Sequence, residues 1–225
     1  MNKLILFDVD GILIPVMSIK YDYWKHIVKE HFNLDVSKKD VYMQGKTDKQ
    51  ILKELLEAKG LKNPLSDKRF EIAMDDIGPT VAKHIESPIP TIENVEVFIK
   101  TLLERQWIIG LLTGNTKEKA RVKLENCHLW KYFKIGAFGD ASDKRSDLVQ
   151  IAMTDAYNKT EKKFEKQNTY IIGDTIRDIK CARDAGVKSI AVATGKEEMN
   201  ILKKENPDFI FKDFNNVEKI MEVLK

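Results

Sequence analysis

Three short apolar segments, each ending in polar residues, limit most strongly the folds that this sequence can adopt. They are "KLILFD" at residues 3–8, "WIIGLLTGN" at 107–115 and "NTYIIGDT" at 168–175. A continuous apolar run of this kind is typical of a strand buried on both faces, as the strands of parallel sheets are. Shorter runs predict further strands at 135–140, 188–195 and 209–213.

Apolar residues with helical spacing occur between these predicted strands. The ranges are 92–105, 116–127, 145–158 and 178–185. Strands that alternate with helices indicate an α/β fold with a doubly wound parallel sheet. We expect this core to comprise residues 1–15 and 88–225.

The segment between these two stretches, residues 16–87, lacks strand signals. Its apolar residues predict helices at 19–32, 47–59 and 66–86, and Gly78-Pro79 is expected to break or kink the last helix. We therefore expect a helical cap domain inserted after the first strand.

Composition excludes several classes of protein. The chain has 225 residues, of which 43% are hydrophobic, and a net charge of +3, so neither a nucleic acid nor a membrane is an expected partner. We expect no signal peptide and no membrane span. Cys127 and Cys181 lie far apart without the spacing of a metal site, which predicts reduced thiols in a cytoplasmic protein.

The polar ends of the three main strands predict the functional site. In doubly wound sheets, ligands bind outside the carboxyl ends of the strands. The side chains brought to that edge are Asp8, Asp10, Thr113, Asn115 and Asp174. Carboxylates that lie close together repel one another unless a cation neutralises them, and Mg²⁺ prefers such oxygen ligands. The pattern therefore predicts a magnesium site.

These residue types also suit phosphoryl transfer. A carboxylate such as Asp8 can attack phosphorus and form an aspartyl-phosphate. Asp10, two residues on, faces the same side of the strand and can protonate the leaving oxygen and then activate water. Thr113 offers a hydroxyl, and the backbone amides of Gly114 and Asn115 can bind an anion at the start of the next helix.

Three motifs in this order resemble the haloacid dehalogenase (HAD) superfamily of phosphohydrolases. They are "FDVDG" (7–11), "LLTGN" (111–115) and "IIGDTIRDIKCARDAG" (171–186). The resemblance covers nearly the whole chain and implies a Rossmann-like core. It implies Asp8 as nucleophile, Asp10 as general acid and base, and Thr113 as a phosphate ligand. Metal ligands would be the Asp8 carboxylate, the Asp10 backbone carbonyl and Asp174, with Asp178 supporting them.

The family also needs one basic residue in its third motif. Two adjacent candidates, Lys144 and Arg145, occur in "ASDKRSDLV" (141–149). The subgroup that resembles phosphoglycolate phosphatases favours Arg145, and the insertion of the cap after the first motif matches that branch. Ile12 departs from the threonine that commonly follows the glycine of the first motif.

The stretch "GKTD" (45–48) in the cap has two interpretations that we keep open. Gly45, Lys46 and Thr47 can contact the substrate, as the resemblance implies. Alternatively, Thr47 is a helix N-cap, and Gln50, three residues later, completes a capping box. The two roles are compatible.

Each feature taken alone has a simpler structural explanation. Asp-x-Asp at a strand end is commonly a turn or a helix cap, and Asp178 could simply cap its helix. The three motifs together favour a Mg²⁺-dependent phosphomonoesterase that acts on a small phosphorylated metabolite, phosphoglycolate-like or a sugar phosphate. The alternatives are a phosphosugar mutase of the same superfamily and a non-catalytic phosphate-binding relative, for which Ile12 is the one favourable feature.

Overall fold

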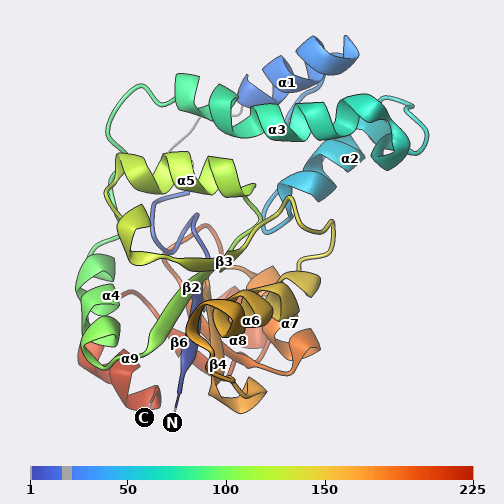
Figure 1. Ribbon diagram of the computed structural model, residues 1–225. Coiled ribbons are helices and arrows are strands. Elements are labelled where there is room, and N and C mark those ends of the chain that lie inside the picture. Colours follow the sequence, from blue (N-terminus) through green and yellow to red (C-terminus); the bar gives the residue numbers. More distant parts are fainter. Residues whose placement is uncertain (1, 17–21, 225) are drawn as a thin grey trace.

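A parallel sheet forms the centre of the molecule (Figure 1). The computed structural model describes residues 2–16 and 22–224. Within them the sheet has six strands in the order β3-β2-β1-β4-β5-β6. The strands are β1 (Leu4–Phe7), β2 (Ile108–Leu112), β3 (Ile135–Ala137), β4 (Thr169–Gly173), β5 (Lys188–Val192) and β6 (Phe209–Phe211). The predicted α/β fold with a doubly wound parallel sheet is confirmed.

The register of the sheet brings three strand ends to one level. Phe7 pairs with Leu111 of β2 on one side and with Ile172 of β4 on the other. From β1 the chain first adds β2 and β3 on one side and then β4, β5 and β6 on the other side. The order of connection therefore reverses between β1 and β4, and such folds have a crevice for ligands at this point. The polar residues that follow β1, β2 and β4 therefore surround this crevice.

Helices cover both faces of the sheet because side chains of β1 alternate between two apolar clusters. Ile5 and Phe7 pack with one group of helices, whereas Leu4 and Leu6 pack with the other. The first group is α4 (Val95–Glu104), α5 (Lys117–Asn126) and α9 (Val217–Val223). The second group is α6 (Asp147–Thr160) and α7 (Ile176–Ala185). The short helix α8 (Met199–Lys204) packs near β5 through Leu202.

Three further helices lie above the carboxyl edge of the sheet (Figure 1). They are α1 (Asp22–Phe32), α2 (Asp48–Ala58) and α3 (Lys68–Lys83). The part of the helix predicted over 19–32 that precedes Asp22 lies outside the described residues. The three helices share an apolar cluster of their own, which includes Trp24, Leu52 and Phe70. We propose on this basis that residues 16–87 form a cap domain on a core of residues 1–15 and 88–225.

Helix α3 runs unbroken through Gly78-Pro79, so the predicted break at this pair is wrong. The face of α3 that includes Phe70, Ile77 and Val81 is buried, and that packing outweighs the cost of about 3 kcal/mol for a proline inside a helix. Gly78 also serves a purpose there, because a Cβ at this position would overlap the side chain of Glu118 on α5. The glycine therefore allows α3 to pack closely against α5.

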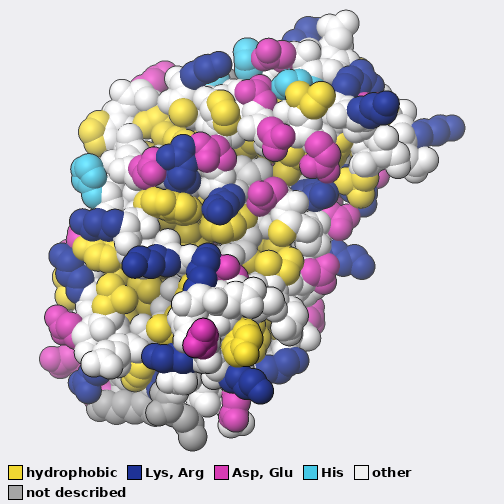
Figure 2. Space-filling view, viewed as in Figure 1, with side chains coloured by type: hydrophobic (Ala, Val, Ile, Leu, Met, Phe, Trp, Pro, Cys, Tyr) yellow, Lys and Arg dark blue, Asp and Glu magenta, His cyan; other side chains and the backbone are white. Residues whose placement is uncertain are grey.

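Surface features agree with the small net charge. On the face shown in Figure 2, basic and acidic side chains are interspersed.

Cys127 and Cys181 are both free thiols. Among the described residues, no helix is long and apolar enough to cross a membrane.

Candidate active site

Three buried carboxylates meet at the carboxyl edge of the sheet. Asp8 directly follows β1, and its backbone N–H donates to the carbonyl of Ile172 at the end of the neighbouring strand β4. Asp174 follows β4, and Asp178 lies in the first turn of α7. Carboxylate oxygens of Asp8, Asp174 and Asp178 lie within 4.8 Å of one another. The sequence predicted that polar residues at the ends of the strands lie at one edge of the sheet, and Asp8 and Asp174 lie together there.

Asp178 is positioned by a reciprocal cap at the start of α7. The hydroxyl of Thr175 accepts a hydrogen bond from the Asp178 backbone, and Oδ2 of Asp178 accepts from both the backbone N–H and the hydroxyl of Thr175. Its other oxygen, Oδ1, accepts from Arg145 at 2.6 Å. Asp178 therefore has the capping role, and its support of a metal site stays a prediction.

Arg145, and not Lys144, lies beside the candidate nucleophile. Nη2 of Arg145 is 3.1 Å from Oδ2 of Asp8, and the guanidinium is buried. The Nε atom of Arg145 is buried and has no hydrogen-bond partner among the described residues. Lys144 is exposed on the loop before α6. This geometry supports Arg145 as the basic residue of the third motif.

Burial and neighbouring negative charges disfavour the ionised form of two of the carboxylates. Burial raises the pKa of Asp8 to about 6, with Arg145 opposing this change and Asp178 adding to it. Burial also raises the pKa of Asp174 well above its usual range, and the negative charges of Asp178 and Asp8 add to the effect. Both shifts are those expected where acidic groups crowd together without enough positive charge.

A divalent cation fits this cluster. Oδ1 of Asp174 is buried and has no hydrogen-bond partner among the described residues, as expected of a ligand atom. A Cβ at Gly11 or at Gly195 would overlap the carboxylate of Asp174, so both glycines are needed for the chain to pass this close. When all four are ionised, the carboxylates of Asp8, Asp10, Asp174 and Asp178 outnumber by two the cations paired with them, Lys123 and Arg145. A hard ion such as Mg²⁺ suits this all-oxygen set.

Asp10 lies beside a second polar network, centred on Asn115. The side-chain amide of Asn115 donates to Oδ2 of Asp10 at 2.9 Å and to the hydroxyl of Thr113 at 2.7 Å. Lys123 donates to both carboxylate oxygens of Asp10 at 2.8 Å. Partial burial would raise the pKa of Asp10, but the charges of Lys123 and Lys119 outweigh it and lower the pKa below its ordinary value.

The cap contributes the loop that carries the "GKTD" stretch. Gly45 and Lys46 line the site cavity, and Gly45 has a φ of +68° that favours glycine. The ammonium of Lys46 is paired with Glu54, and the hydroxyl of Thr47 accepts from the backbone N–H of Gln50 as an N-cap. The structure thus gives Thr47 the capping role, and contact of this loop with a substrate stays a prediction. The side-chain amide of Gln50 donates to Glu54.

The cap loop is also bonded directly to the loop after β2. The backbone N–H of Asp48 donates to the carbonyl of Gly114 at 2.6 Å. A Cβ at Gly114 would overlap the carbonyl oxygen of Lys46, so only glycine permits this approach. The two loops enclose a cavity of about 560 Å³ whose lining includes Asp8, Asp10 and Thr113.

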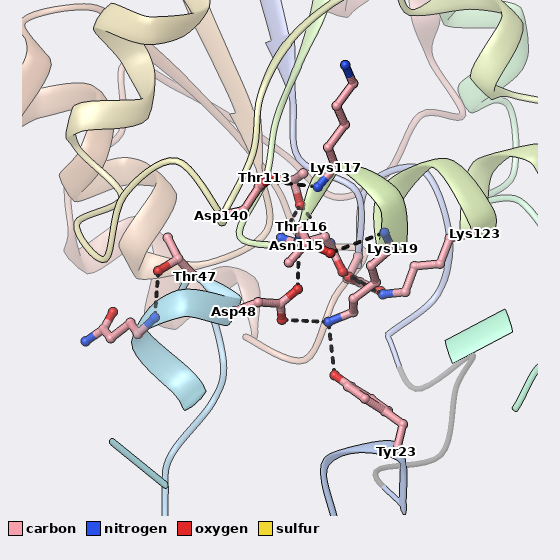
Figure 3. Close-up of polar contacts among 12 residues, drawn as sticks. Tyr23, Thr47, Asp48, Thr113, Asn115, Thr116, Lys117, Lys119, Lys123 and Asp140 are labelled. Carbon is pink, nitrogen blue, oxygen red and sulfur yellow. Dashed lines mark hydrogen bonds and ion pairs between the residues drawn. The ribbon is translucent and has the colours of Figure 1, made fainter. Parts of the chain in front are cut away.

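Two buried lysines on α5 complete the site, and the sequence analysis missed them (Figure 3). Lys119 donates to Oδ1 of Asp48 at 2.7 Å and to the hydroxyl of Tyr23 at 3.0 Å. Lys123 lies one turn further along α5 and contacts Asp10. Both lysines lie on the face of α5 that also buries Ala120 and Leu124.

Comparison with known proteins places these features in a family. The family described as haloacid dehalogenase-like hydrolase matches residues 5–192. The chain is 24% identical over 219 residues to pyrophosphatase PpaX of Oceanobacillus iheyensis, covering 96% of this chain and 94% of the relative. It is 23% identical over 221 residues to a phosphoglycolate phosphatase of Agrobacterium fabrum, covering 95% and 90%.

A solved structure has the same fold. A hydrolase from Pseudomonas syringae matches with a TM-score of 0.74 at 17% identity, covering 100% of this chain and 99% of that one. At this level of identity the likeness shows the fold alone.

Proposed function

The chain belongs to the haloacid dehalogenase-like hydrolases, and from this premise we propose that it is a Mg²⁺-dependent phosphomonoesterase acting through an aspartyl-phosphate on Asp8. The observation that carries the proposal is the contact between Asp8 and Arg145 beside the buried oxygen of Asp174. A nucleophile, a charge stabiliser and a metal ligand then lie within one crevice. A protein that only binds phosphate has no need of this combination.

The first step is attack by a carboxylate oxygen of Asp8 on the phosphorus of the substrate. Arg145 stabilises the negative charge of the phosphoryl group, and its unpaired Nε is an available donor. The hydroxyl of Thr113 and the adjacent backbone amides hold the phosphoryl oxygens. Asp8, the backbone carbonyl of Asp10, and Asp174 would hold Mg²⁺, which supplies positive charge against the repulsion between the carboxylate and the phosphate.

Asp10 handles the protons in both steps. In its protonated form it gives its proton to the oxygen of the leaving group as the bond to phosphorus breaks, and becomes a carboxylate. In the second step the same carboxylate takes a proton from water, which attacks the phosphorus and releases Asp8 and inorganic phosphate. The side-chain amide of Asn115 donates to Oδ2 of this carboxylate.

The cap excludes bulk water and selects the substrate. A cavity of about 560 Å³ has the size of a pocket for a small molecule. The relatives that the chain resembles are named as a pyrophosphatase and a phosphoglycolate phosphatase. We propose a small phosphorylated metabolite, phosphoglycolate-like or a sugar phosphate, as substrate.

The two free thiols support a cytoplasmic location.

The test is an assay of phosphate release by the purified chain of 225 residues. The substrates are p-nitrophenyl phosphate, pyrophosphate, 2-phosphoglycolate and a set of sugar phosphates, each with Mg²⁺ and with a chelator. We expect release that requires Mg²⁺ and is lost in Asp8→Asn. Interconversion of sugar phosphate isomers without net release of phosphate would indicate a mutase. A folded wild type that binds phosphate and acts on none of these compounds would indicate a non-catalytic relative.

A further inference from the structure

The buried face of α5 is unusual because half of its buried residues are lysines. The four are Lys119, Ala120, Lys123 and Leu124. The side chain of Lys123 is 5% exposed and that of Lys119 is 7% exposed. Two ammonium groups one helical turn apart repel each other, and each loses its hydration on burial. Each lysine is therefore expected to have a specific counter-charge.

The two counter-charges come from different parts of the molecule. Lys119 reaches Asp48 and Tyr23, which belong to the cap helices, so its contacts join the cap to α5 (Figure 3). Lys123 makes no such contact with the described residues of the cap. Its hydrogen-bond partners within the described part of the chain are the two oxygens of Asp10 and Oδ1 of Asn115.

The backbone alone does not hold the Asp10 side chain. Asp10 lies three residues beyond the end of β1, and Gly11, which follows it, has a φ of +89°. The Asp10 side chain is 33% exposed. A carboxylate in a turn, open to the cavity on one side, has several accessible rotamers. Contacts from neighbouring elements must select one of them.

We propose that Lys123 is the positioning residue that holds Asp10 in the orientation for proton transfer. Its ammonium bonds to both oxygens of Asp10 at 2.8 Å and to Oδ1 of Asn115 at 2.9 Å. Asn115 in turn donates to Oδ2 of Asp10, so three side chains form a closed triangle of hydrogen bonds. Asn115 also bonds to Thr113, which ties this triangle to the residue that holds the phosphate.

This inference rests on the proposed function, and its test separates the two. General acid catalysis matters for a substrate whose leaving group is a poor one, such as an alkyl alcohol, and matters little for p-nitrophenolate. The value of kcat/KM reports the steps through departure of the leaving group. A residue that acts only by orienting Asp10 must therefore affect kcat/KM for an alkyl phosphate much more than kcat/KM for p-nitrophenyl phosphate.

The experiment compares Lys123→Met with Lys119→Met, a matched loss of a buried ammonium from the same helix. The substrates are p-nitrophenyl phosphate and whichever of 2-phosphoglycolate, glycerol phosphate and glucose 6-phosphate the wild type hydrolyses fastest. For Lys123→Met we expect kcat/KM to fall by about 10²-fold on the alkyl phosphate and by less than about tenfold on the aryl ester. Lys119→Met should change the two substrates by a similar factor.

A second comparison asks whether Lys123 acts through Asp10. In an Asp10→Asn background, Lys123→Met should cause no further loss on the alkyl phosphate, because the residue that it orients is already absent. Lys123→Gln, which keeps a donor, serves as the second variant if Lys123→Met does not fold.

The outcomes are distinct. Equal losses on both substrates, or a further loss in the Asp10→Asn background, would overturn the role of Lys123 while leaving the proposed function intact. A wild type that hydrolyses neither substrate would overturn the proposed function, and the inference with it.

Discussion

Nη2 of Arg145 lies 3.1 Å from Oδ2 of Asp8, although the two residues are far apart in the sequence and on opposite sides of the cap segment. The same nitrogen donates to Asp178 at 2.6 Å, so Arg145 is held by one carboxylate while it contacts the other. A guanidinium fixed in this way has little freedom to reorganise during a reaction. Fixed charge of this kind stabilises a transition state more than mobile charge does.

The pair of adjacent basic residues gives the first prediction. Arg145→Ala should lower kcat/KM for p-nitrophenyl phosphate by about 10²- to 10³-fold, because a buried charge stabiliser is lost. Lys144→Ala, at the exposed neighbouring position, should stay within about twofold of the wild type. Steady-state kinetics of the two variants decide the assignment. A large loss in Lys144→Ala with a small loss in Arg145→Ala would reverse it.

A second prediction concerns pH and stability in the presence of a chelator. The pKa of Asp8 is raised from 3.8 to about 6, so the folded chain holds this proton more tightly than the unfolded chain does. Between these two values the free energy of unfolding therefore falls as pH rises, and it stays lowered above pH 6. An upward displacement of this size corresponds to roughly 3 kcal/mol.

The check is urea unfolding of the wild type and of Asp8→Asn with a chelator across this pH range. Asp8→Asn should gain stability relative to the wild type as pH rises, because its amide does not ionise. Added Mg²⁺ should stabilise the wild type more at neutral than at acidic pH, since it binds the ionised carboxylates. A difference between the two proteins that does not change with pH would contradict the account.

Gly195 gives a third prediction, about the metal site. A Cβ at this position would overlap Oδ2 of Asp174, so Gly195→Ala should displace that carboxylate. We expect about a 10- to 100-fold loss of Mg²⁺ affinity, which calorimetry or the Mg²⁺ dependence of turnover can measure.

Gly60→Ala is the matched control, because its Cβ would meet no atom within 4 Å although its φ is +87°. It should cost about 1 kcal/mol in stability and leave Mg²⁺ affinity unchanged. Equal Mg²⁺ affinity in Gly195→Ala and the wild type would show that Asp174 is not a ligand.

The buried ion pair between Asp48 and Lys119 gives a fourth prediction. The two side chains are 2% and 7% exposed, and Asp48 also accepts from the backbone N–H of Thr116. Asp48→Ala should lower the free energy of unfolding by about 3–5 kcal/mol, because it leaves a buried ammonium without a counter-charge. Adding Lys119→Met to Asp48→Ala should recover part of this loss. A loss below about 1 kcal/mol in Asp48→Ala, measured by urea unfolding, would contradict the prediction.

The sheet and its order of elements could be predicted because each main strand is a continuous apolar run that ends in polar residues. The strand "LILF", for example, is buried at all four positions. Helices α8 and α9 were not predicted, since they are short, with six and seven residues. The break expected at Pro79 is wrong because burial of the rest of α3 outweighs the local preference.

Asp8, Asp10 and Asp174 could be found from sequence because they follow the strands closely, whereas Asp178 was named from the family resemblance. Lys119 and Lys123 could not be assigned this way, since lysines in a charged helix are usually solvated. Their role depends on which acids the fold brings opposite them, Asp48 from the cap and Asp10 from the first strand end. The distinction between Lys144 and Arg145 likewise depended on the direction of the chain before α6.

The proposed mechanism requires that Asp8 carries the phosphoryl group during turnover. The most direct measurement is the mass of the wild type quenched in acid while it turns over substrate with Mg²⁺, followed by mapping of the peptide that contains residues 4–13. We predict the addition of one phosphoryl group at Asp8, and none in Asp8→Asn. Full turnover by Asp8→Asn, or steady turnover by the wild type with the phosphoryl group on another residue, would contradict the account.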